Sequence, residues 1–247
     1  MALFASAAAV VFGFAGVPAA HAADCGITAG SIAQITAIQN DPSLSSSDEI
    51  KRELALRKIL VGETIVCAEQ EAQTFQANLA TTTVPSDVQS LQSQLSGNLT
   101  EAESFYNSEM EQLNVVGIAG TKVVAQQVLA WRASTFIPLG ENVNNFILWA
   151  QNQDLFNTAQ IRMNQTQSAV SFLEAASPNT DLQTAFNNAQ TSFNNAQTEN
   201  AAAKAALIQN LSPDQSLALI KQSLSSLSDT YQGFSDVSTA ISKILPQ

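Results

Sequence analysis

The apolar positions within residues 184–197 repeat every seven residues, because TAFNNAQ is followed directly by TSFNNAQ. Apolar steps that alternate between four and three residues keep one side of an α-helix apolar. The same steps run over Leu182, Phe186, Ala189, Phe193, Ala196, Asn200, Ala203 and Leu207. We therefore predict a helix at 180–210 whose Phe and Ala side chains pack against another helix while the Asn pairs face water. Asn200 either fixes the register of this packing or is exposed.

The segment 213–245 carries the same heptad spacing after Ser212 and Pro213, which are typical of a helix start. Its apolar positions are Leu217, Ile220, Leu224, Leu227, Tyr231, Phe234, Ser238, Ile241 and Leu245. Only a short turn separates it from the preceding helix. We therefore predict an antiparallel helical hairpin about 45 Å long.

Helical spacing also predicts three elements nearer the N-terminus, at 28–39, 47–80 and 86–114. The apolar line of the second is Ile50, Leu54, Val61, Ile65, Ala68, Ala72, Phe75 and Leu79. The line of the third is Val88, Leu91, Leu95, Leu99, Ala102, Tyr106, Met110 and Leu113. The third line has an eleven-residue period, which favours a nearly straight helix.

The middle of the chain is more apolar. We predict a helix at 117–135 that is apolar on more than one face and therefore central, a break at Pro138 and Gly140, and a further helix at 141–175. No segment alternates at period two for long enough to be a strand. The predicted fold is all-α, an elongated antiparallel helical bundle with long coiled-coil-like helices, formed by residues 23–247 as one domain.

Residues 1–22 are typical of a signal peptide. The stretch from Met1 to Ala20 has no charged residue, and Ala20-His21-Ala22 matches a cleavage site. We expect cleavage after Ala22 and export to the periplasm, the cell surface or the medium. The alternative is that the segment is kept as a membrane anchor. The two cysteines, Cys25 and Cys67, are expected to form a disulfide, with two free thiols as the alternative.

The charge distribution argues against some partners. The formal net charge is -11, which disfavours binding to nucleic acid or to anionic lipid. From Leu60 to Gly120 there are eight acidic residues and no basic one. We interpret this stretch, which includes every acidic residue at 63–111, as a solvated surface, and binding of divalent cations or of a basic partner is the alternative.

Catalytic chemistry lacks its usual residues. The only histidine, His21, lies in the predicted signal peptide, so the mature chain has no histidine for a nucleophilic triad or a zinc site. The closely spaced glutamates, such as Glu69 and Glu71, point to different sides of a helix at a spacing of two. We predict that the protein is not an enzyme and holds no metal or cofactor.

Five aromatic residues are the best candidates for a ligand or partner site: Trp131, Phe136, Phe146, Trp149 and Phe156. A turn at Pro138 would bring the two tryptophans together, and Trp is typical of binding hot spots. The competing interpretation is that these residues form the core around a kinked connection.

We therefore expect an exported, non-catalytic helical bundle that binds another protein or forms part of an envelope or surface structure. One alternative is a membrane-active or pore-forming protein that uses the apolar segment 115–131. Another is a sensor-like bundle that binds a small ligand at the aromatic residues. Membrane contact is possible but not favoured, and the sequence does not determine the oligomeric state.

Overall fold

The computed structural model describes Cys25 and residues 29–244, and it is all-α as predicted. The described residues contain no strand. The predicted signal peptide at 1–22 lies outside the described residues, and so does Leu245 at the end of the last predicted seam.

The elements follow one another as helices with short connections. Their bounds are α1 Ala29–Gln39, α2 Ser46–Thr81, the 3-10 turn η1 Ser86–Val88, α3 Gln89–Val115, α4 Ile118–Trp131, the π-helix η2 Arg132–Phe136, α5 Ile137–Ala176, α6 Thr180–Ile208 and α7 Pro213–Ile244. Most ends lie within one or two residues of the predicted bounds. The exception is the middle of the chain, where the predicted break is absent.

The chain divides into two compact units, with the boundary between Ile147 and Leu148 inside α5. We call the described residues up to Ile147 the N-terminal unit and those from Leu148 onward the C-terminal unit. The sequence predicts one domain at 23–247, whereas each unit has a hydrophobic core of its own.

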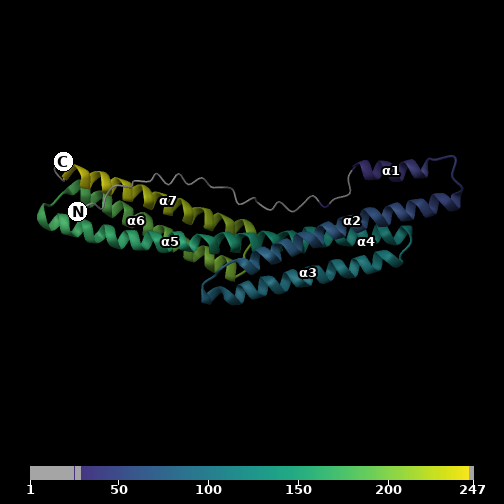
Figure 1. Cartoon of the computed structure of the whole chain (residues 1–247), viewed down its shortest axis with the longest axis horizontal. Helices are drawn as coiled ribbons and strands as arrows, with labels where there is room; N and C mark the ends of the chain where they lie inside the picture. The colour runs from purple at the N-terminus through teal and green to yellow at the C-terminus, as the bar shows by residue number, and fades with distance from the viewer. Residues whose placement is uncertain (1–24, 26–28, 245–247) are drawn as a thin grey trace. The chain divides into compact units, whose positions relative to one another are not determined.

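The N-terminal unit is built on α2, α3 and α4, which run side by side, with α1 lying on α2 (Figure 1). Its fully buried side chains include Ile65, Leu79, Leu99, Tyr106, Leu113, Val124 and Phe136. Most of these positions belong to the predicted apolar lines of α2 and α3. Two residues depart from the predicted lines. Ile50 belongs to the predicted apolar line of α2 but is exposed at the start of that helix. Glu109 does not belong to the predicted line of α3 but is buried there, beside the half-buried Met110.

The two cysteines are joined by a disulfide between Cys25 and Cys67, with a Cα–Cα distance of 5.6 Å. This agrees with the predicted pairing. The bond connects Cys25, four residues before the start of α1, to the middle of α2.

The C-terminal unit packs the second part of α5 against α6 and α7, and its core contains Phe156, Phe186, Phe193, Leu227 and Val237 among others. The predicted seam of α6 is confirmed, since its apolar members are all buried. The four paired asparagines, at 187, 188, 194 and 195, are exposed. The repeat is therefore a packing seam.

Asn200 lies in this seam and is half-buried. Its amide and that of Gln153 on α5 form two reciprocal hydrogen bonds, of 3.1 and 3.3 Å. A polar pair at one seam position favours one alignment of two helices over alternatives. The geometry therefore agrees with a role for Asn200 in setting the register.

The seam of α7 differs from the prediction. The buried line is Ser216, Ile220, Ser223, Leu227, Thr230, Gly233, Val237 and Ala240. The larger predicted residues, such as Leu224 and Phe234, are only partly buried beside it, and Ser238 is exposed. Small residues point inward because α6 approaches closely: a Cβ on Gly233 would lie 2.6 Å from the Cβ of Ala189.

The predicted break at Pro138 is wrong, because the helical chain continues from Ile118 to Ala176 through η2. The N–H of Ile137 donates to the carbonyl of Arg132, five residues back. This wider turn shifts the preceding carbonyls, so that the proline ring avoids the clash expected in a regular α-helix. Gly140 is also helical, and a Cβ there would lie 2.7 Å from the ring of Phe75. The glycine allows close packing and does not end the helix.

The prediction that 117–135 is a central helix is also wrong. Thr121, Val124 and Val128 of α4 are buried, whereas Val123 and Leu129 are about half exposed. The helix therefore has one inward face, and its exposed apolar residues lie at separate positions around the rest of its surface.

Candidate functional site

The most unusual polar group in the N-terminal unit is the ion pair between Arg132 and Glu71. Arg132 lies on η2, and its Nη2 donates to Oε2 of Glu71 on α2 at 2.9 Å. Each side chain is only 8% exposed. A buried charge is costly unless it is paired and hydrogen-bonded, so each of these residues requires the other. We call these two residues the buried pair.

Aromatic rings enclose the buried pair. Tyr106 on α3 accepts a 3.4 Å hydrogen bond from Nη1 of Arg132, and the guanidinium lies 5.3 Å from the centre of the Phe136 ring. Trp131 stacks on Phe105 with ring centres 4.2 Å apart, and it meets Tyr106 edge to face. A cation over a ring face and offset or perpendicular ring pairs are favourable contacts. Side chains from α2, α3, α4 and η2 therefore meet at one point.

Burial raises the pKa of the Tyr106 phenol to about 12, and the charge of Arg132 opposes this only in part. The phenol therefore stays protonated near neutral pH. A neutral phenol beside a neutralised charge pair is a poor general base. The cluster is suited to hold helices in place.

One atom of the cluster is not satisfied by the protein. Oε1 of Glu71 is buried, and no hydrogen-bond partner reaches it. A buried oxygen of this kind ordinarily binds a donor such as an internal water. Among the described residues, no group of three or more His, Cys, Asp or Glu side chains lies close enough together to hold a metal ion.

The structure does not gather the five predicted aromatic residues into one site. The ring centres of Trp131 and Phe136 lie 6.2 Å apart, and both residues belong to the cluster around the buried pair. Phe146 belongs to the N-terminal unit, about 22 Å along the helix from Trp131 at 1.5 Å per residue. Trp149 and Phe156 belong to the C-terminal unit, where Phe156 is part of the core. The helix does not turn at Pro138, so the expected convergence of the tryptophans has no basis.

Sequence reasoning missed Arg132 and Glu71. The spacing of the inward-facing positions on the middle helix could have pointed to Arg132. Val128, Arg132, Phe136 and Gly140 are all buried and follow each other in steps of four. Three such steps exceed the 3.6 residues per turn of an α-helix and indicate a locally wider helix. A single arginine in that line predicts a buried ion pair.

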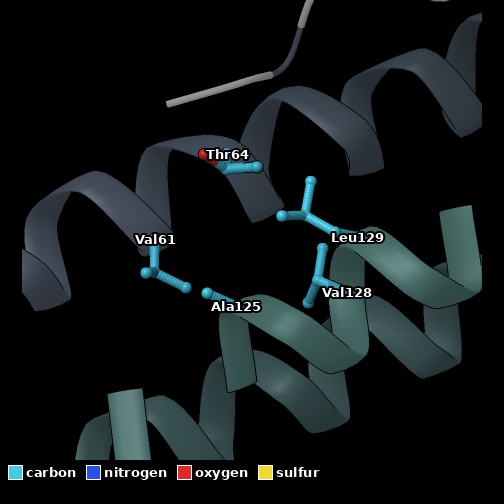
Figure 2. Close-up of a pocket in the computed structure, with 5 residues that line it drawn as sticks. All are labelled: Val61, Thr64, Ala125, Val128 and Leu129. Carbon is cyan, nitrogen blue, oxygen red and sulfur yellow. The ribbon is translucent and has the colours of Figure 1, made fainter. Parts of the chain in front are cut away.

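A small apolar pocket lies elsewhere in the N-terminal unit, between α2 and α4. Figure 2 shows Val61 and Thr64 of α2 facing Ala125, Val128 and Leu129 of α4. Its volume is about 10 Å³, roughly the room for one water. Small-molecule sites are usually about 300–1,000 Å³. The pocket is thus a depression in an apolar surface and is too small to hold a substrate.

The apolar segment 115–131 includes all of α4, which is 14 residues long. In the part of the chain that the structure describes, no helix combines the length and the apolar character needed to cross a membrane.

Comparisons with protein-family models, with curated proteins and with solved structures find no match.

Proposed function

We propose that the chain is an exported, non-catalytic helical-bundle protein that binds another protein, free in solution or as part of an envelope or surface structure. Two features support export. The uncharged apolar start is followed by Ala20-His21-Ala22, which is typical of a cleaved signal. The Cys25–Cys67 disulfide is compatible with an oxidising compartment.

The observation that carries the binding role is the apolar surface between α2 and α4. Leu129, which lines the pocket between these helices, is 51% exposed. Val61 and Ala125 line the same pocket (Figure 2). Clustered apolar side chains at a depression are typical of protein-binding surfaces, where buried anchors supply most of the affinity.

The interior supports the same conclusion. The aromatic rings around the buried pair contact one another and fill the space between the helices. Because these rings are occupied with one another, we expect a partner to bind at the surface of the unit.

Site-specific photo-crosslinking in the native host tests the proposal. A photoreactive amino acid replaces Leu129 in one variant and Asn188, which is exposed on α6, in the other. We expect discrete cross-linked protein products from position 129 and few from position 188. Ala125→Glu, at a half-buried residue that lines the pocket, should reduce the products formed from position 129, because a charge on this surface opposes burial.

Two results would count against the proposal. If neither position forms a protein adduct in the envelope or the medium, the surface between α2 and α4 has no partner. If the crosslinks from both positions reach lipid alone, the membrane-active alternative is favoured.

A further inference from the structure

The helix α1 is attached to the rest of the N-terminal unit in an unusual way. It packs on α2 (Figure 1), yet none of the side chains described for it is fully buried. Ile35 and Ile38 are half-buried, and Ile32 is 57% exposed. By contrast, α2, α3 and α4 share a core with fully buried side chains. The packing of α1 therefore contributes little burial for its length.

The described contacts hold α1 mainly at its two ends. At the start, the disulfide ties Cys25 to Cys67, which is 42 residues later in the chain. At the other end, Nε2 of Gln39 donates to Oε1 of Glu53 at 3.0 Å, and Arg57 pairs with the same oxygen. The chain then turns back into α2 after Asn40. Attachment at both ends keeps α1 close to α2 even though the surface between them is small.

The helical state of α1 depends on this attachment. The helix has 11 residues, and isolated helices shorter than about 12–15 residues are marginal in water. Its sequence has no acidic residue in the first turn and no basic residue in the last, so the favourable charge interactions with helix ends are missing. Once detached from α2, α1 should lose its helical hydrogen bonds.

We propose that α1 is a strap that the disulfide holds on α2, and that reduction of the disulfide releases the strap while the bundle of α2, α3 and α4 stays folded. A dithiol supplies the two electrons. Its thiolate attacks one sulfur of the pair and releases the other cysteine as a thiolate, and its second thiol then attacks the resulting mixed disulfide and releases the remaining cysteine. Cys25 and Cys67 become thiols, and the dithiol becomes a cyclic disulfide.

Release would change the surface of α2. Cys25 is bonded to Cys67 of α2, and Gln39 of the strap contacts Glu53 of α2, so both α2 residues become more accessible when the strap leaves. Thr64, which lines the apolar pocket, lies three residues before Cys67 and therefore within one turn of it. The strap is thus a redox-sensitive element beside the apolar surface, and this inference does not depend on that surface having a partner.

Hydrogen exchange on the full mature chain tests the proposal, with and without dithiothreitol. We expect amides at 34–39 to exchange at least about tenfold faster after reduction, because local opening then exposes their hydrogen bonds. Amides in the middle of α3 should keep their rates. The Cys25→Ser/Cys67→Ala double variant should show the fast exchange without reductant and should not respond to it.

Two outcomes would overturn the proposal. If the exchange of α1 is unchanged in the reduced protein and in the double variant, packing alone holds the helix. If α3 loses its protection together with α1, the disulfide stabilises the whole unit and α1 is not a separate strap.

Discussion

Two helical glycines show how one residue type has opposite consequences in different surroundings. Gly97 on α3 has nothing within 4 Å of the place where a Cβ would be, whereas a Cβ on Gly140 would lie 2.7 Å from the Phe75 ring. The Phe75 side chain is buried, so its ring has little room to move in a close-packed core.

We predict that the two Gly→Ala changes alter stability with opposite signs. Gly97→Ala should raise the free energy of unfolding by about 0.5–1 kcal/mol, because alanine is the better helix former. Gly140→Ala should lower it by about 1–3 kcal/mol through overpacking. Urea denaturation of both variants measures the difference. A stabilising Gly140→Ala would show that α5 and Phe75 are not in close contact.

The repeat on α6 supports a second prediction. Phe193 is 2% exposed, so Phe193→Ala should lower the free energy of unfolding by about 3–5 kcal/mol. The adjacent Asn194 is exposed, so Asn194→Ala should change it by less than about 0.5 kcal/mol. Thermal melts of the two variants decide the matter. Equal losses would mean that the asparagines have a structural role which the packing does not explain.

The π-helix is an element whose geometry and side chains act together. It lets Pro138 follow without a break, and it places Arg132 in line with Val128 and Phe136 on the inward face. Arg132 then meets Glu71, which is 61 residues earlier in the chain. The buried pair therefore links the junction between α4 and α5 to α2.

A double-mutant cycle tests this link. Glu71→Leu and Arg132→Met should each lower the free energy of unfolding by about 3–5 kcal/mol, because each leaves a buried charge unpaired. The double variant should lose less than either single variant, since it has no buried charge. Chemical denaturation measures all four proteins. Additive losses would show that the two charges do not interact.

The other ion pair of α2 provides a comparison. Arg57 pairs with Glu53 four residues away, and the two side chains are 26% and 9% exposed. Gln39 also donates to the same Glu53 oxygen, so the loss of Arg57 does not leave that carboxylate without a partner. Partly exposed pairs on one helix contribute about 0.3–0.5 kcal/mol. Arg57→Met should therefore have a much smaller effect than Arg132→Met.

At the scale of the whole molecule, the two tryptophans report on different cores. Trp131 belongs to the N-terminal unit and Trp149 to the C-terminal unit. In a Trp131→Phe background, Phe193→Ala should shift the unfolding followed by Trp149 fluorescence to lower urea. In a Trp149→Phe background, the same change should leave the Trp131 transition in place, because each unit has its own core. Equal shifts would show that the units unfold as one.

The sequence by itself determined the features that depend on neighbours along the chain. Helical spacing located most of the helices, and the heptad of Phe186 and Phe193 identified the buried side of α6. These features depend on backbone periodicity, which every sequence window carries.

Only the tertiary structure decided the features that depend on distances between elements. The close approach of α6 turned the small residues of α7 inward, as at Gly233 beside Ala189. The π-helix removed the expected turn at Pro138, so Trp131 and Trp149 did not converge. Glu71 on α2 and Arg132 on η2, 61 residues apart in the chain, became partners. Each of these arrangements is stabilised by groups that are far apart in the sequence. A local sequence pattern does not specify the distance between such groups in the folded chain.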